Sequence, residues 1–307
     1  MELNQIVNKF NNNPKYLSNG AGKLARRWNC TKEDIYEARK IIRGEKQVTK
    51  RLPKVLIFDI ESSPSITYTF GRFKVNIGID QVIQDPLFLT WSAKWLYSSE
   101  IIHDKITQEE VLEADDYRIV KSLWNLVDEA DIVIAHYGDN FDIPMLNYRA
   151  IINGLNPFSS VKSVDTKKVA SMVFKFPSNK LDALAGYFGV GHKIKTDFEL
   201  WKRCLNGEED AITEMDVYCQ QDVKILEDVY LRLRPYVKAH PNLAVYNDLE
   251  EIQCSMCGST DLTPEGYYYT NTSKYDQYRC SCGALTRGRI NLLTKNKKKN
   301  LLTSIPR

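Results

Sequence analysis

The sequence predicts an α/β domain built on a mixed sheet, with a small helical module before it and a cysteine-rich ribbon after it. Two continuous apolar runs, residues 54–58 and 131–135, are typical of buried central strands. Between residues 117 and 237, helical and strand-like stretches alternate, as they do in sheets flanked by helices. Four cysteines gathered within residues 254–282 indicate a separate small unit.

Residues 1–46 are predicted to form a module of three short helices. Apolar residues at helical spacing favour helices over Glu2–Phe10 and Gly22–Asn29. A third helix is expected to open at Thr31, a favourable N-cap that precedes an apolar stripe. Residues 47–53 are polar and basic, and we expect them to be a linker.

The last two of these helices follow one another closely and together look like a helix-turn-helix. Such a module would turn the basic side of its final helix toward a nucleic acid. The candidate contacts on that side are Lys32, Arg39, Lys40 and Arg43. Small helical bundles with a basic face also dock proteins, so both interpretations stay open.

Residues 54–240 are expected to form the central domain. Stretches rich in β-branched and aromatic residues predict further strands over Ile66–Val75, Phe88–Tyr97, Ile101–Ile106 and Val161–Val164. Apolar residues at helical spacing predict helices over Tyr117–Ala130, Ile143–Asn153, Leu181–Phe188 and Ala211–Val237. Antiparallel strands followed by alternating helices and strands predict a mixed sheet with one antiparallel edge.

Carboxylates stand at the ends of both buried strands. Asp59 and Glu61 are two residues apart, so on a strand they point to the same side. Acids beside such an apolar run are costly unless they bind a metal or stay solvated. Asp142 follows the second buried strand, and by itself it could be the N-cap of the next helix, with Pro144 in the first turn.

Tyr218 and Asp222 stand four residues apart in the long last helix and therefore share a face. Taken singly, Tyr218 has a simpler explanation as a core residue. The order of the whole set along the chain is what favours a catalytic site.

The ordered set resembles the three exonuclease motifs of the DEDDy group in the DnaQ-like superfamily. The motifs are Asp-x-Glu at Asp59 and Glu61, Asn-Phe-Asp ending at Asp142, and Tyr-x-x-x-Asp from Tyr218 to Asp222. The resemblance runs from about residue 54 to 236 and includes the run Lys180-Leu181-Asp182-Ala183-Leu184. It is closest to proofreading domains of family B DNA polymerases and to stand-alone phage or bacterial relatives.

This resemblance implies a ribonuclease H-like fold and a two-metal 3′→5′ exonuclease. Carboxylates without a histidine or thiol partner suit Mg²⁺ or Mn²⁺. By resemblance, Asp59, Glu61 and Asp222 would hold one ion, Asp59 and a water-linked Asp142 would hold the second, and Tyr218 would orient the attacking water. The related DEDDh enzymes carry a histidine where this chain has Val217, so His136 is expected to be a packing residue.

Residues 250–290 are predicted to be a structural zinc ribbon. Cys254 and Cys257 form a C-x-x-C-G motif, and Cys280 and Cys282 form C-x-C-G after 22 intervening residues. A disulfide framework is the alternative, and it would be unusual in a cytosolic protein. The second cysteine pair is one residue shorter than the usual knuckle.

A basic tail, residues 291–307, follows the ribbon. Ribbon tyrosines beside Arg287 and Arg289 could hold single-stranded nucleic acid by stacking and phosphate contact. They could equally be ribbon core followed by a disordered tail. The three remaining cysteines, Cys30, Cys204 and Cys219, are expected to be apolar fillers.

Charge and composition fit this organisation. Residues 1–54 carry a net charge of +8, residues 55–283 carry −12 and residues 284–307 carry +7, so an acidic centre lies between basic ends. No apolar run reaches the roughly 18 residues that span a bilayer, and the N-terminus lacks a secretory pattern. We therefore expect a cytoplasmic protein, in a bacterium or an infected host cell.

The function expected from the sequence is exonucleolytic hydrolysis of DNA, at single strands or 3′ ends, with two Mg²⁺ or Mn²⁺ ions and one structural Zn²⁺. An RNA exonuclease of the same mechanism is the first alternative, because nothing in the motifs reads the 2′-hydroxyl. The others are a structure-selective endonuclease and an idle nucleic-acid-binding or protein-docking factor.

Overall fold

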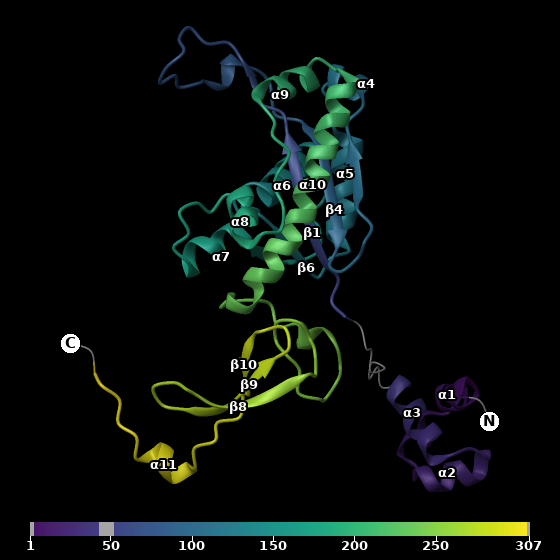
Figure 1. Cartoon of the computed structure of the whole chain (residues 1–307). Coiled ribbons are helices and arrows are strands. Elements are labelled where there is room, and N and C mark those ends of the chain that lie inside the picture. Colours follow the sequence, from purple (N-terminus) through teal and green to yellow (C-terminus); the bar gives the residue numbers. More distant parts are fainter. Residues whose placement is uncertain (1–2, 43–51, 306–307) are drawn as a thin grey trace. The chain divides into compact units, whose positions relative to one another are not determined.

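The computed structural model describes residues 3–42 and 52–305 (Figure 1). It divides into two units, one formed by residues 1–52 with 245–251 and the other by residues 53–244 with 252–307. None of the helices in the described ranges combines the length and apolar character needed to cross a membrane.

The first unit contains the predicted short helices, α1 (Leu3–Asn12), α2 (Ala21–Trp28) and α3 (Lys32–Ile42), with a 3₁₀ turn, η1 (Pro14–Ser18), after α1. The apolar stripes of the three helices form one small core of buried side chains from Ile6, Phe10, Leu24, Trp28, Ile35 and Ala38. Each helix is too short to be stable alone in water, so this shared core is what stabilises them.

Thr31 caps α3 as predicted. The backbone N–H of Asp34 donates to Thr31 Oγ1 at 3.1 Å, and the Thr31 N–H donates to Asp34 Oδ2 at 2.8 Å, which is a reciprocal capping box. Asn29 ends α2 with a left-handed φ of 49°. The predicted linker lies outside the described residues except at residues 52 and 53.

The central domain is built on a five-stranded sheet in the order β5-β4-β1-β6-β7. Its strands are β1 (Val55–Ser62), β4 (Phe88–Trp95), β5 (Ile102–Lys105), β6 (Ile132–Ala135) and β7 (Lys162–Asp165). β4 and β5 run antiparallel to their neighbours, whereas β1, β6 and β7 are parallel. The prediction of a mixed sheet with an antiparallel edge is confirmed.

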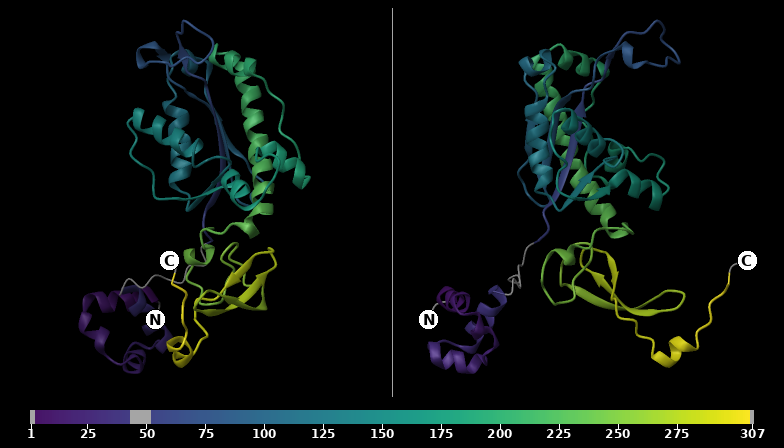
Figure 2. Two further views of the ribbon diagram at one scale, coloured as in Figure 1. Left: turned by 90° about the vertical axis from the view of Figure 1, so that its left-hand side faces the viewer. Right: turned by 180° about the vertical axis from the view of Figure 1, so that it is seen from behind.

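Helices cover both sides of this sheet, as Figure 2 shows for α10 (green) and α5 (blue). The long helix α10 (Glu209–Leu233) packs on β1 and β4, while α5 (Tyr117–Asp128) packs on β4 and β5 and also contacts α6 (Asp142–Ile152). The core between them contains the fully buried strand residues Leu56, Phe58, Phe88, Leu89 and Val133. Burial on both sides explains why the strands read as continuous apolar runs.

The prediction of a strand over Ile66–Val75 is wrong. Only β2 (Ile66–Thr67) forms there, paired with β3 (Val82–Gln84), and η2 (Ile79–Gln81) is a 3₁₀ turn. The remaining aromatic side chains, including Phe70 and Phe73, are exposed. Strand propensity depends on packing against a neighbouring strand, and this segment has none beyond the short β2–β3 pair in the described structure.

Several short helices were not predicted from the sequence: α4 (Gln108–Leu112), α7 (Thr166–Val173), α9 (Phe198–Leu205) and α11 (Lys295–Lys299). Polar N-caps define them more than apolar stripes do. Thr107, Asp165, Asp197 and Thr294 each accept a backbone hydrogen bond from the first turn of the helix that follows. The predicted helix α8 (Leu181–Phe188) is confirmed.

The ribbon is a three-stranded antiparallel sheet in the order β10-β9-β8. Its strands are β8 (Leu262–Tyr269), β9 (Lys274–Cys280) and β10 (Leu285–Arg287), and two 3₁₀ turns, η3 (Arg234–Tyr236) and η4 (Leu243–Tyr246), precede it. Its buried apolar set comprises only Cys254, Cys280 and Ala284, so its own core contributes little to stability.

Candidate catalytic and metal sites

Asp59 and Glu61 lie where β1 runs past its parallel neighbour. The β1–β6 ladder pairs only Val55–Ile57, so the end of β1 that carries the two acids is not covered by β6. On its other side this end pairs with β4 up to Ser62, with a register shift after Glu61. The strand therefore presents both carboxylates at an open edge that remains partly exposed to solvent.

Asp142 fills part of this open edge. Its Oδ1 accepts a hydrogen bond from the Ile60 N–H at 3.1 Å, which satisfies a backbone donor that β6 leaves unpaired. The simpler alternative of an N-cap is wrong, because the cap residue is Phe141 and Asp142 is already the first residue of α6. Further along α6, Arg149 makes a buried bidentate pair with Asp116, at 2.7 Å for both bonds, which fixes this helix against the start of α5.

Tyr218 and Asp222 are positioned by polar contacts between α10 and β4. Thr90 donates to Asp216 Oδ1 at 3.0 Å before the motif, and Lys94 forms a buried ion pair with Glu227 after it. These two contacts fix the rotation and the height of α10 against the sheet. Their effect is to place the face that carries Tyr218 and Asp222 in front of β1.

The structure brings the carboxylates together as a cluster. One oxygen from each of Asp59, Glu61 and Asp222 lies within 4.8 Å of the others. Asp142 is not in that group, but it adjoins it through Ile60 and repels Asp59 electrostatically. Cys219 is buried among them, and its thiol donates to the carbonyl oxygen of Asp59 at 3.5 Å.

The cluster is electrostatically unfavourable as it stands. Burial, with repulsion from Asp222 next, raises the pKa of Asp59 to about 7. Burial together with neighbouring carboxylates raises the pKa of Glu61 and of Asp142 well above the usual range. The pKa of Asp222 is also raised by burial, although Lys193 opposes the shift. Clustered carboxylates of this kind are stabilised by a bound cation.

Lys193 is a member of this site that sequence reasoning missed. Its ammonium forms an ion pair with Asp222 and lies 4.9 Å from the centre of the Tyr218 ring. Burial lowers the pKa of Lys193, but the pairing with Asp222 raises it overall. The backbone N–H of Lys193 donates to Asp182 Oδ1 at 2.9 Å. Asp182 belongs to the Lys-Leu-Asp run singled out in the sequence, and that run was the available signal.

Tyr218 is poised as a hydrogen-bond donor. Only 8% of it is exposed, and its ring packs edge-on against Trp201. Burial raises the pKa of Tyr218 to about 12, so the phenol keeps its proton at neutral pH. His136 takes no part in the cluster, because its ring nitrogens contact Thr166 Oγ1 at 2.9 Å and the Asn179 carbonyl at 3.0 Å.

The residues fit a hard divalent cation. Both carboxylate oxygens of Asp222 are buried, and Lys193 is the cation that pairs with them among the described residues. The donors are oxygens only, which is the ligand set that Mg²⁺ and Mn²⁺ prefer. Asp59, Glu61 and Asp222 could hold one ion directly.

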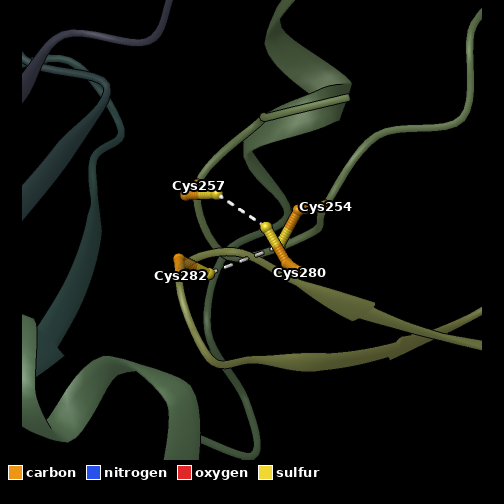
Figure 3. A group of neighbouring side chains, drawn as sticks. All are labelled: Cys254, Cys257, Cys280 and Cys282. Atoms are coloured by element: carbon orange, nitrogen blue, oxygen red, sulfur yellow. Dashed lines mark hydrogen bonds between the residues drawn. The ribbon is translucent and has the colours of Figure 1, made fainter. Parts of the chain in front are cut away.

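The four ribbon cysteines converge on a common centre (Figure 3). Cys254 Sγ lies 3.8 Å from Cys282 Sγ, and Cys257 Sγ lies 3.5 Å from Cys280 Sγ. Tetrahedral zinc with bonds of about 2.3 Å places its sulfurs roughly 3.8 Å apart. The distances are far longer than a disulfide bond of about 2 Å, so the disulfide alternative is wrong for these pairs.

Two glycines shape the knuckles. Gly258 and Gly283 have φ angles of 74° and 88°, which favour glycine, and each donates its N–H back to the first cysteine of its pair at 2.9 Å. The shorter second pair still brings Cys282 into the group. A hydrogen bond from Cys257 lowers the pKa of Cys254 to about 5, which favours the thiolate that binds metal.

The candidate nucleic-acid contacts differ in their surroundings. Arg39 is engaged within the first unit, where its guanidinium donates to the carbonyls of Tyr16 and Asn19. Lys32, Arg287 and Arg289 are exposed. Arg43 and the side chain of Lys40 lie outside the described residues.

Residues 95–234 match the RNase H superfamily. The match includes Asp142, Tyr218 and Asp222 and begins after the strand that carries Asp59 and Glu61. The mixed sheet with its flanking helices agrees with it. The central domain is RNase H-like. The ribonuclease H-like fold expected from the sequence is therefore confirmed.

Among solved structures, the chain is similar to the family B DNA polymerase from the hyperthermophilic archaeon Pyrobaculum calidifontis. The TM-score is 0.46 at 17% identity, over 62% of this chain and 26% of the polymerase chain. The chain thus spans about a quarter of that protein. No curated protein matches the sequence.

Proposed function

We propose that the chain is a metal-dependent 3′→5′ exonuclease that hydrolyses the phosphodiester bonds of DNA. The observation that carries the proposal is the convergence of Asp59, Glu61 and Asp222 at the open end of β1, with Asp142 adjoining, on an RNase H-like domain. The 3′→5′ polarity and the preference for DNA rest on the motif resemblance alone.

Two Mg²⁺ or Mn²⁺ ions, when bound, would stabilise the attacking and leaving oxygens of an in-line displacement. Asp59, Glu61 and Asp222 would hold one, and Asp59 with a water-linked Asp142 would hold the other. The phenol of Tyr218 stays protonated, so it orients a water molecule by hydrogen bonding and does not remove its proton. This role corresponds to the DEDDy subtype.

Lys193 has two parts in this scheme. Its ammonium neutralises Asp222 in the arrangement seen here, so a divalent cation must compete with it. Once the divalent cation has displaced it from Asp222, the Lys193 ammonium can pair with the negative charge that develops on the scissile phosphate.

The test uses single-stranded DNA carrying a label at either end, incubated with Mn²⁺ and the wild-type chain. Early loss of the 3′ label, together with a ladder of 5′-labelled products, would support the proposal. Asp59→Ala is the control and should leave both labels intact. Matched RNA decides the sugar preference. Internal cleavage products that appear first would indicate an endonuclease and contradict the proposal.

The ion pair between Lys193 and Asp222 favours a second candidate, a catalytically idle nucleic-acid-binding factor. In that case Lys193 would stand permanently in place of a metal. Mn²⁺ titration by calorimetry separates the two, because the idle factor would show no binding that depends on Asp59.

We also propose that the ribbon binds one structural Zn²⁺ through Cys254, Cys257, Cys280 and Cys282. The sulfur distances and the lowered pKa of Cys254 support this assignment. Four thiolates complete a tetrahedral shell, which leaves no position for a substrate.

A further inference from the structure

A groove lies between η3 and the ribbon, outside the carboxylate cluster. It has a volume of about 1050 Å³. Residues from η3 and the segment that follows it form one wall, and residues from all three ribbon strands form the other. The backbone contact between Leu243 and Ser255, at 2.9 Å, and the packing of Pro235 near Gly283 hold the two walls together.

The lining of this groove is basic. It contains Lys238, Arg287 and Arg289, and it contains no aspartate or glutamate. All three cations are exposed, and none of them forms an ion pair with a described residue. Nearby carboxylates ordinarily neutralise part of a basic surface, and none of them lines this groove. The groove therefore favours an anionic ligand.

Aromatic side chains lie among these cations. Tyr268 and Tyr236 line the groove and are 43% and 56% exposed. Tyr268 faces Tyr275 directly across the β8–β9 ladder, so both point to the same side of the ribbon. The Arg287 guanidinium lies 4.3 Å from the centre of the Tyr275 ring and 5.4 Å from that of Tyr268.

This combination distinguishes a polymer of bases and phosphates from other anions. An acidic peptide needs cations but gains little from exposed flat rings. A single-stranded nucleic acid uses both, because its bases stack on aromatic rings while its phosphates contact cations. The arginine held against two tyrosine rings is preorganised for a phosphate or a base plane. Duplex DNA offers no unstacked bases to Tyr268 or Tyr236.

We propose that the groove between η3 and the ribbon binds single-stranded nucleic acid, with Tyr236 and Tyr268 stacking on bases and Lys238, Arg287 and Arg289 contacting phosphates. This deepens the proposed function and rests on it only for the direction of the strand. α10 links the two sites, since Leu233 lies 11 residues, or about 17 Å, beyond Asp222 along the helix. The groove would hold the strand several nucleotides away from the end that is cleaved.

Binding is measured apart from cleavage. The full-length chain carrying Asp59→Asn is titrated against fluorescein-labelled single-stranded oligodeoxythymidine of 20 nucleotides, and anisotropy gives the Kd. Tyr268→Leu should weaken binding about fivefold or more, and Tyr268→Phe, which keeps the ring, should restore it. The double variant Lys238→Ala/Arg289→Ala should weaken binding and lower the slope of log K against log salt by about 1.4, or 0.7 per lost phosphate contact.

The matched control removes the same charge elsewhere. Lys224→Ala/Arg232→Ala deletes two exposed cations of α10 that do not line the groove. It should leave the salt slope within error of the parent. Zinc content is measured for every variant, so that a collapsed ribbon is recognised. If Tyr268→Leu lost zinc, Tyr268→Phe and the charge variants would decide the question.

Unchanged binding in both the Tyr268→Leu and the Lys238→Ala/Arg289→Ala proteins would overturn the proposal. Displacement of the oligonucleotide by polyglutamate of equal charge, with no effect of Tyr268→Leu, would assign the groove to an acidic polypeptide and also overturn it. Either result leaves the exonuclease proposal intact, because cleavage is measured separately. If the wild-type chain bound the oligonucleotide normally but did not cleave it, the exonuclease proposal would be contradicted and the groove proposal would stand.

Discussion

The carboxylate cluster, counted with the adjoining Asp142, and the cysteine cluster each offer four candidate ligands, but their surroundings differ. The carboxylates stand on a sheet whose strands and helices bury a large apolar core. The cysteines stand in a ribbon whose buried set is three residues, two of them cysteines themselves. We therefore expect the central domain to fold without a metal, whereas the ribbon should need the proposed zinc ion in order to fold.

The two clusters also differ in what a metal would relieve. Among the carboxylates it would relieve repulsion and desolvation, which raise the pKa values of all four acids. Among the cysteines it would replace weak sulfur–sulfur contacts by strong bonds. The proposed divalent ions would therefore serve the chemistry, and the proposed zinc ion would serve the fold of the ribbon.

The largest effect is expected for Asp59→Asn. Loss of a ligand to both proposed ions should lower the rate of cleavage by at least about 10³-fold. Without metal, the variant should be no less stable than the wild type, because a buried charge repelled by Asp222 is removed. Activity assays test the loss of cleavage, and chemical denaturation in metal-free buffer tests the stability. A variant that is inactive because it is unfolded would contradict the difference drawn between the sites.

The reverse pattern is expected for Cys254→Ser. One zinc per chain should be lost, the ribbon should become sensitive to protease, and the central domain should keep its own unfolding transition. Metal analysis, limited proteolysis and calorimetry provide the measurements, with Cys204→Ser as a control in a cysteine outside the cluster. Retention of zinc by Cys254→Ser would remove the basis for a four-cysteine site.

Lys193→Met should affect stability and metal binding in opposite directions. Without metal, Asp222 loses its charged partner, and the free energy of unfolding should fall by roughly 3 kcal/mol. Mn²⁺ should then bind more tightly than to the wild type, since it no longer competes with an ammonium. Denaturation with and without Mn²⁺ measures both changes. Equal destabilisation under the two conditions would show that Lys193 only supports the fold.

The smallest effect is expected for Tyr218→Phe. The ring and its packing on Trp201 are kept and only the hydroxyl is lost, so kcat should fall about 10- to 100-fold while KM stays near its wild-type value. Steady-state kinetics on single-stranded DNA test this. A full rate in Tyr218→Phe would show that the hydroxyl does not orient the water.

Much of this site could be predicted because its residues sit at the ends of strongly patterned elements. The apolar run before Asp59 and the long helix around Asp222 specify a buried strand and a covering helix, and their order along the chain pointed to one edge of a sheet. Lys193 could not be found in the same way. Lys193 lies in a segment without regular secondary structure, after Gly189 and Gly191, where no periodicity fixes the direction of a side chain.

The errors have physical reasons as well. Ile66–Val75 has the composition of a strand, but composition cannot show whether a partner strand is available. The local sequence allows Asp142 to be a helix cap, yet its carboxylate accepts from the N–H of Ile60, a contact between residues 82 positions apart. Contacts over such separations are set by the fold as a whole. The local sequence around Asp142 does not contain them.

The hydrogen bond between Asp142 and Ile60 has a consequence for how this site could evolve. The carboxylate of Asp142 adjoins the carboxylate cluster and also accepts from the Ile60 N–H beyond the end of the β1–β6 ladder, so it has a structural role that does not depend on catalysis. Among the described residues, the side chains of Asp59 and Glu61 accept no comparable hydrogen bond from the backbone. If a relative of this chain lost the proposed hydrolytic activity, Asp59 and Glu61 could be replaced by neutral residues without loss of a backbone hydrogen bond, whereas replacing Asp142 would leave the Ile60 N–H without its acceptor.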